Sequence, residues 1–359
     1  MMPPEKPLLT VIVPAYNEEQ IIQHNLSIIC EYLASLEAEY RWELIVVDDG
    51  STDATGKIAD SFAAERGRVV VLHHKFNFKL GQALRFAFNE SKGDYVAVLD
   101  IDLSYTPAHV GRMLARMKET GAKIVIASPY AKGGKVSNVP WARRLLSFWA
   151  NRFLAMTVAK DSQSDKLTTI TGMVRAYDGK FLRRLTLKSM DVEINPEIIY
   201  KAKILRARIM ECPAHLDWKP ALETGSLAVR RKSSLKVARS MVHHILSGYI
   251  FRPFMFFIVP GGLLFVLSLY PLTWTVVHTI HAYRKAAGPG LSFDYRLSDA
   301  IGAAFAASPH SFIVGGIALL VAIQLISLGL LSLQKKRYFE ELYYLNTTIH
   351  KDLRRKNDQ

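Results

Sequence analysis

Residues 95–103 read YVAVLDIDL, an apolar run followed at once by two aspartates one residue apart. A short run of this composition predicts a buried strand. Similar runs occupy residues 10–14, 43–47, 69–72 and 123–127, and helical patterns occupy residues 18–36, 54–65, 81–89 and 108–118. Strands that alternate with helices predict βαβ units, so we expect an α/β fold with a mostly parallel sheet flanked by helices.

The polar residues that follow these strands are expected to meet at one edge of the sheet, where such sheets bind ligands. The first strand leads into PAYNE (14–18) and the second ends in DDGSTD (48–53). A helix cap by Ser51, Thr52 or Asp53 explains one polar side chain there. It does not explain the two acids directly after the strand, which are suited to accept hydrogen bonds from a ribose or a base.

Asp100 and Asp102 form a second acidic feature at this edge. Residues i and i+2 of an extended segment point the same way, so the two carboxylates are expected to converge. Converging carboxylates suit a hard divalent cation better than mutual repulsion. The alternative is a solvated loop with two acids, but the position after a buried strand favours the metal site.

The charge of the chain is divided unevenly along its 359 residues. Residues 1–100 carry 9 Lys+Arg and 15 Asp+Glu, net −6, and the rest carry 37 and 17, net +20. This asymmetry argues against a uniformly basic nucleic-acid binder. Two cysteines exclude a disulfide scaffold, and the absence of GxGxxG, GKT and GxSxG motifs leaves dinucleotide, P-loop and hydrolase chemistry unsupported.

Two segments near the C-terminus, 254–280 and 311–333, contain no Lys, Arg, Asp or Glu. Each is long enough to cross a bilayer core; the alternative is a pair of buried helices in a soluble domain. Basic residues before the first segment and after the second place both ends in the cytoplasm and the connection outside. The N-terminus lacks the features of a signal peptide. We therefore expect a multi-pass protein of the inner (cytoplasmic) membrane, with its catalytic domain and both termini in the cytosol.

These motifs resemble family 2 glycosyltransferases of the GT-A type. The resemblance lies in VIVPAYNEE (11–19), IVVDDGSTDAT (45–55), residues 77–85 and YVAVLDIDL (95–103), and it extends over roughly residues 8–220. Residues 171–177, TGMVRAY, and 208–213, RIMECP, are similar to the acceptor-side segments of polyprenyl-phosphate glycosyltransferases such as dolichyl-phosphate mannose synthase.

The resemblance implies inverting transfer of a sugar from a nucleotide-sugar, with a UDP-sugar favoured over GDP-mannose, to a polyprenyl phosphate at the cytosolic membrane face. It implies a nucleotide site at Pro14, Tyr16, Glu18, Asp48, Asp49 and Gly81. Asp100 and Asp102 would hold Mg²⁺ or Mn²⁺ and form the catalytic set with Arg143. Arg143, Ser147, Arg230, Arg231 and Lys232 would meet the acceptor phosphate. A homotetramer is the assembly that bacterial members suggest; no nucleic acid is expected as a partner.

Four positions depart from the family pattern. Lys79 stands at a common glycine, Ser104 at a glutamine, Pro129 at an arginine and Thr168 at an aspartate. A phosphate acceptor is already ionised and needs no general base, so Thr168 is compatible with it. Two alternatives stay open: a glycolipid synthase acting on a lipid hydroxyl, with Asp165 as base, and a non-catalytic membrane scaffold derived from a transferase.

The expected domain organisation has four parts. Residues 1–228 form a cytosolic GT-A domain and residues 229–253 a basic amphipathic region at the membrane interface. Residues 254–333 form the two-helix membrane anchor, and residues 334–359 a basic amphipathic tail in the cytosol.

Overall fold

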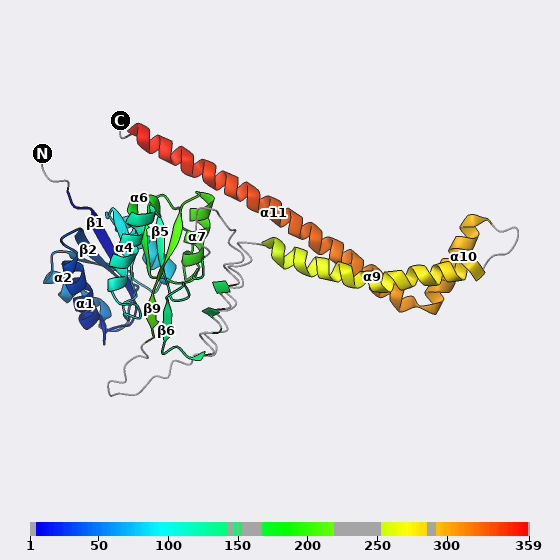
Figure 1. The fold of residues 1–359 in the computed structure, drawn as a ribbon, viewed down its shortest axis with the longest axis horizontal. Helices are drawn as coiled ribbons and strands as arrows, with labels where there is room; N and C mark the ends of the chain where they lie inside the picture. Colours follow the sequence, from blue (N-terminus) through cyan, green and yellow to red (C-terminus); the bar gives the residue numbers. More distant parts are fainter. Residues whose placement is uncertain are drawn as a thin grey trace. The chain divides into compact units, whose positions relative to one another are not determined.

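The structure is a computed structural model that describes residues 5–141, 145, 147–148, 151–152, 167–218, 253–285 and 292–357. The chain divides into two compact units (Figure 1). One comprises Met1–Gly248 with Thr347–Gln359, and the other comprises Tyr249–Asn346.

The first unit is built on a seven-stranded sheet in the order β3-β2-β1-β4-β7-β5-β8. Its strands are β1 (Leu8–Ala15), β2 (Arg41–Asp48), β3 (Val69–His73), β4 (Tyr95–Val98), β5 (Ile124–Ser128), β7 (Arg175–Asp178) and β8 (Ile209–Pro213). All neighbours pair in parallel except β7, which is antiparallel to both β4 and β5. A small separate sheet joins β6 (Lys135–Ser137) to β9 (His215–Asp217).

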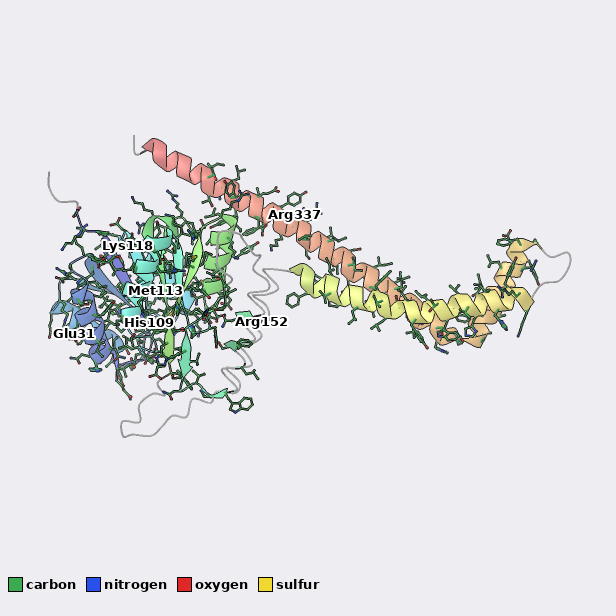
Figure 2. All side chains as sticks on the ribbon, in the orientation of Figure 1. Glu31, His109, Met113, Lys118, Arg152 and Arg337 are labelled. Atoms are coloured by element: carbon green, nitrogen blue, oxygen red, sulfur yellow. The ribbon has the colours of Figure 1, made fainter. Side chains whose placement is uncertain are left out.

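Helices cover both faces of the large sheet. They are α1 (Ile22–Ser35), α2 (Thr55–Ala64), α3 (Leu80–Glu90), α4 (Ala108–Thr120), α6 (Gly179–Leu182) and α7 (Ile194–Ile204). Alternate residues of a strand face opposite sides. Leu9 and Val11 of β1 accordingly join the cluster with α1, α2 and α4, whereas Ile12, also fully buried, is outside that cluster. Met113 of α4 is buried in the same cluster (Figure 2).

The predicted mostly parallel α/β sheet is confirmed, and the strands and helices predicted within residues 10–127 are present within a few residues of their expected bounds. The region predicted to lie at the membrane interface, 229–253, is outside the described residues except for Pro253. One local expectation is wrong: the segment from Asp100 to Leu103 is a turn and not an extended strand end. The Leu103 amide donates to the Asp100 carbonyl at 3.2 Å, and Leu103 has φ 50°. The Asn25 side-chain amide fixes this turn by donating to the Ile101 carbonyl at 2.8 Å.

The second unit contains α9 (Pro253–Lys285), α10 (Phe293–Ala307) and the first part of α11 (Pro309–Asn357). Both Phe256–Lys285 and Pro309–Ile349 are long and apolar enough to cross a membrane. Their large apolar side chains are exposed, as at Leu263 (62%) and Leu320 (69%). Exposure on this scale argues against helices buried in a soluble core and favours contact with lipid.

Glycines bring α9 and α11 close together within this unit. A Cβ added at Gly329 would lie 2.4 Å from the Ile258 side chain, and one at Gly261 would lie 3.0 Å from Leu325. Small residues that permit close approach are typical of helix contacts in membranes. The helix α10 between the two spans was not predicted from the sequence.

Candidate active site

The loops that follow β1 and β2 form one continuous structure at the carboxyl edge of the sheet. Ala15 and Asp48, the last residues of the two strands, are paired in register. The Asn17 amide donates to Ser51 Oγ at 3.0 Å, and the Thr52 amide donates to Asn17 Oδ1 at 2.8 Å. The Glu18 amide donates to Thr55 Oγ1 at 2.7 Å. These bonds fix the two loops in place without a ligand.

Two consecutive histidines hold the two acids at the end of β2. His73 Nδ1 lies 3.0 Å from Asp48 Oδ2, and His74 Nδ1 lies 2.8 Å from Asp49 Oδ1. His73 Nε2 also lies 2.9 Å from Asp60 Oδ1. Burial lowers the pKa of His73, but the hydrogen bonds and charges of Asp60 and Asp48 outweigh burial and raise it above 6.5. Both ring nitrogens of His73 therefore face carboxylates, an arrangement that favours the charged form of the imidazole.

Asp49 also orders the loop that leads into α3. Its Oδ1 accepts from the Phe78 amide at 3.0 Å and its Oδ2 from the Lys79 amide at 2.9 Å. Lys79 has φ 77° and ψ 165°, a conformation that is nearly restricted to glycine. The predicted nucleotide residues Asp48 and Asp49 are at the expected edge, and each already has partners within the protein.

Gly81 has a packing reason to be glycine. A Cβ at this position would lie 2.6 Å from the backbone of Met190 and 2.6 Å from the Ser189 carbonyl oxygen. The contact joins the start of α3 to the segment before α7, where the Gln82 amide donates to the Met190 carbonyl at 3.1 Å. The predicted nucleotide role of Gly81 remains a prediction beside this structural one.

Asp100 and Asp102 lie close enough for their charges to interact. Burial, and next the charge of Asp102, raise the pKa of Asp100 to about 7. The Ser104 amide donates to Asp102 Oδ1 at 2.9 Å, and no described residue donates a hydrogen bond to the second oxygen of Asp102. No hydrogen bond reaches the Asp100 carboxylate from the residues that the structure describes. A half-buried carboxylate pair of this kind is neutralised by a cation or a proton.

A divalent cation fits this pair. Mg²⁺ in proteins is commonly held by one or two carboxylates, with substrate phosphates and water completing its shell. Among the described residues, no group of three or more His, Cys, Asp or Glu could hold a metal ion. Two carboxylates with open coordination positions therefore suit a metal that arrives with, or accepts, a diphosphate.

A second loop, residues 167–172, lies beside the ends of β5 and β8 and overlaps the start of the predicted acceptor-side segment 171–177, so we call it the acceptor loop. Glu211 of β8 holds it: Oε1 accepts from the amides of Thr168 (2.8 Å) and Thr169 (2.7 Å), and Oε2 accepts from Thr168 Oγ1 (2.8 Å). Burial raises the pKa of Glu211. Both oxygens of the Glu211 carboxylate thus accept hydrogen bonds from this loop.

Buried polar side chains hold the rest of this acceptor loop. Asn151 Oδ1 accepts from the Ile170 amide at 2.8 Å and the Thr171 amide at 3.1 Å. The guanidinium of Arg175, fully buried, donates to the carbonyls of Ile170 (2.6 Å), Gly172 (2.8 Å) and Asn195 (2.9 Å). The sequence predicted no role in the site for Asn151 or the histidine pair, because their partners come from other segments of the chain. Arg175 belongs to the predicted acceptor-side segment 171–177, but the sequence did not show its buried contacts with carbonyl groups.

The remaining predicted site residues are distributed as follows. Pro14 lies in β1, Tyr16 is 42% exposed just beyond it, and Glu18 begins the turn before α1. Ser147 is described on a short helical stretch, where its carbonyl accepts from Asn151 Nδ2 at 3.0 Å. Arg143, Asp165, Arg230, Arg231 and Lys232 lie outside the described residues.

Comparison with known proteins shows which class of proteins this chain resembles. The sequence profile of glycosyl transferase family 2 matches residues 10–186. The polyprenol monophosphomannose synthase of Mycolicibacterium smegmatis is 36% identical over 188 residues, 50% of this chain and 65% of that protein. The undecaprenyl-phosphate mannosyltransferase of Micrococcus luteus is 30% identical over 208 residues, 56% of this chain and 80% of that protein. The chain thus spans slightly less than two thirds of the first relative.

These matches define the class as glycosyltransferases. The chain belongs to glycosyl transferase family 2. Among solved structures, a mannosyltransferase from Pyrobaculum calidifontis in complex with GDP-Man and Mn²⁺ aligns with 98% of this chain and 88% of its own, at 17% identity and a TM-score of 0.45.

Proposed function

We propose that this chain transfers a sugar from a nucleotide-sugar to a polyprenyl phosphate at the cytosolic face of a membrane, with inversion. The observation that carries the proposal is the Asp100–Asp102 pair, which follows β4 beside the ordered loops after β1 and β2 and has no basic partner among the described residues. The names of both relatives given above describe transfer to or formation of a polyprenol-linked mannose.

The residues at the carboxyl edge of the sheet support a way of binding the nucleotide-sugar donor. Asp100 and Asp102 would hold Mg²⁺ or Mn²⁺, which supplies charge neutralisation for the diphosphate leaving group. The loops at residues 15–19 and 48–55 are already ordered by hydrogen bonds, so they provide a fixed surface for the nucleoside. Asp48 and Asp49 keep lone pairs for a ribose or base in addition to their histidine partners.

The acceptor side favours a phosphate over an alcohol. An alcohol needs a general base, whereas a phosphate is ionised at neutral pH and attacks directly. Thr168, at the usual aspartate position, carries no carboxylate, and both oxygens of the nearby Glu211 accept hydrogen bonds from the loop. Within the described part of the acceptor loop, no carboxylate is therefore available as a base.

The donor sugar is to be identified by a panel. The relatives' names make mannose the first sugar to test, and the sequence features favour a uridine nucleotide. We therefore include GDP-mannose and a set of UDP-hexoses, each with Mn²⁺ and with Mg²⁺.

The test uses the purified full chain in detergent, a polyprenyl phosphate and, separately, a diacylglycerol. We expect metal-dependent transfer to the phosphate and not to the alcohol. Asp102→Asn should lower kcat by about 10²-fold or more, as expected for loss of electrostatic stabilisation of the leaving group. Asp94→Asn is the matched control, because Asp94 lies at the opposite end of β4 and its carboxylate accepts only from the Leu8 amide in the described structure.

Full activity of Asp102→Asn would exclude the metal role of the pair. Transfer to diacylglycerol alone would replace the proposal by a glycolipid synthase. A wild-type chain that transfers no sugar from any donor in the panel, while binding the nucleotides, would favour the scaffold alternative.

A further inference from the structure

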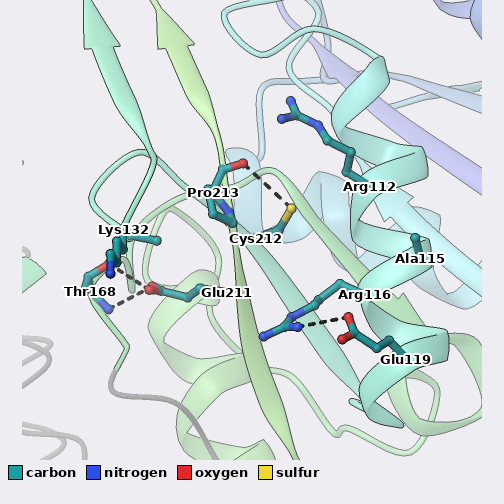
Figure 3. A pocket seen from close by; sticks show the side chains of 10 residues that line it. Arg112, Ala115, Arg116, Glu119, Lys132, Thr168, Glu211, Cys212 and Pro213 are labelled. Carbon is teal, nitrogen blue, oxygen red and sulfur yellow. Dashed lines mark hydrogen bonds and ion pairs between the residues drawn. The ribbon is translucent and has the colours of Figure 1, made fainter.

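A groove separate from the Asp100–Asp102 pair lies between α4 and β8, the last strand at one side of the sheet (Figure 3). Its volume is about 860 Å³. That size is within the usual range for small-molecule sites. Figure 3 shows Arg112 and Arg116 of α4 on one side of β8, with Lys132 and Thr168 on the other. We call this feature the α4–β8 groove.

The α4–β8 groove is cationic. Three basic side chains line it, Arg112, Arg116 and Lys132, against two acids, Glu119 and Glu211. Glu119 is paired with Arg116 at 3.0 Å. No ion pair of Arg112 or Lys132 is found among the residues that the structure describes. Two cationic groups therefore face the groove without a neutralising partner from the described protein.

Within the described residues, Glu211 forms no ion pair with a basic side chain of the groove, unlike Glu119. Its two oxygens point into the acceptor loop, where the amides of Thr168 and Thr169 and the Thr168 hydroxyl donate to them. The accessible polar groups of the groove are thus mainly guanidinium and ammonium donors. Arg is the side chain best suited to hold phosphate through two parallel hydrogen bonds.

The rest of the lining is small and apolar. Ala115, Ala131 and Pro213 contribute surface without hydrogen-bond donors from their side chains. A bare inorganic anion would fill only a small part of this volume. A phosphate ester, with its phosphate at the basic residues and its organic part against the apolar ones, matches both halves of the lining.

We propose that the α4–β8 groove is a binding site for an organic phosphate ester, with cationic contacts from Arg112 and Arg116 on the α4 side of β8 and from Lys132 on the side of the acceptor loop. The site is distinct from the metal edge and adjoins the acceptor loop through Thr168. If the ester is the lipid acceptor, this inference deepens the proposed function and rests on it. The groove then supplies cationic groups that Pro129 does not.

The test measures binding without donor or metal, so that failure of sugar transfer cannot be mistaken for failure of this site. The full chain in an uncharged detergent is titrated with geranyl phosphate, with geraniol and with inorganic phosphate. The variant Arg112→Gln/Lys132→Gln removes two charges from the groove. Arg41→Gln/Lys118→Gln removes two charges elsewhere; Lys118 is on α4 but pairs with Glu39 at 2.9 Å (Figure 2).

We expect geranyl phosphate to bind at least about tenfold more weakly to Arg112→Gln/Lys132→Gln than to wild type, a change of about 1.4 kcal/mol, because charge-assisted hydrogen bonds to the phosphate are lost. The Arg41→Gln/Lys118→Gln variant should bind like wild type. Equal thermal midpoints of the two double variants show that both are folded.

Unchanged binding in Arg112→Gln/Lys132→Gln would overturn the proposal, and so would geraniol binding as tightly as geranyl phosphate. Inorganic phosphate binding as tightly as geranyl phosphate would also overturn the proposal of an ester site, because the organic part of the ligand would then contribute nothing to binding. Weak inorganic phosphate binding would support the ester.

Discussion

Lys79 is one of the five non-glycine residues in the described part of the chain that have a positive φ. It adopts φ 77° and ψ 165° directly before α3, and its amide donates to Asp49. Lysine has a Cβ that is crowded in this region, at a cost of about 1–3 kcal/mol. The aspartate that is predicted to bind the nucleotide thus holds a strained residue in place.

Lys79→Gly should therefore stabilise the protein. Release of strain outweighs the extra chain entropy of glycine, about 0.5–1 kcal/mol, so we expect a net gain of about 1 kcal/mol. The thermal midpoint in detergent measures it. Lys75→Gly, in the same loop but without a positive φ, is the control and should lower the midpoint or leave it unchanged. Equal losses in both variants would contradict the strain at Lys79.

The strands and helices of the first 130 residues could be predicted because their apolar patterns are local. Each buried strand is a short apolar run, and α4 ends at Gly121, whose φ of 66° suits glycine. The acceptor loop has no such pattern. Glu211 and Asn151 hold it from positions distant in the sequence, so only the resemblance to a family pointed to it.

The candidate site was predictable to a similar extent. The sequence placed Asp48, Asp49, Asp100 and Asp102 after strands that prove to be neighbours through β1. It did not show the turn at residues 100–103, because the Asn25 side chain that fixes this turn comes from α1. The sequence also did not show that His73 and His74 bond Asp48 and Asp49. Two adjacent histidines without metal-ligand spacing do not indicate which residues they contact.

Glu211→Ala tests the acceptor loop as an element. The change leaves two amides and one hydroxyl without their acceptor, and unsatisfied buried donors cost about 1–3 kcal/mol each. We expect a loss of about 2–4 kcal/mol in stability and a higher apparent KM for the lipid acceptor. Chemical denaturation and steady-state kinetics measure the two effects.

Glu119→Ala is the control for this prediction, because Glu119 lines the same groove but makes only a surface ion pair. Such pairs contribute about 0–1 kcal/mol. Similar losses of stability in Glu119→Ala and Glu211→Ala would show that Glu211 does not hold the loop.

At the scale of the whole molecule, the net charge of +14 is the sum of an acidic segment and a basic remainder. Residues 1–100, with net −6, contain Glu18, Asp48, Asp49 and Asp100 of the predicted donor edge, and Asp102 follows two residues later. The basic remainder includes the flanks of the two long apolar helices, whose side chains are largely exposed. The charge distribution thus bears on membrane orientation as well as on ligand binding.

The orientation is testable by cysteine labelling in intact cells. Cys30 and Cys212 are buried, so single added cysteines dominate labelling. A membrane-impermeant maleimide should label Ser298→Cys, on α10 between the spans, and should label Asn346→Cys only after lysis. Labelling of Asn346→Cys in intact cells, with Ser298→Cys protected, would reverse the assigned orientation.

The uninterrupted helix α11 has a mechanical consequence. Its 49 residues span about 74 Å at 1.5 Å per residue, more than twice the roughly 30 Å of a bilayer core. An unbroken helix transmits rotation along its axis. A rotation of the apolar segment of α11 therefore also rotates the tail that follows it. One alanine inserted after Arg337 would turn the tail by about 100° relative to the membrane segment, and four would turn it by only about 40°. The number of residues in α11 therefore sets the rotational position of the tail about the helix axis.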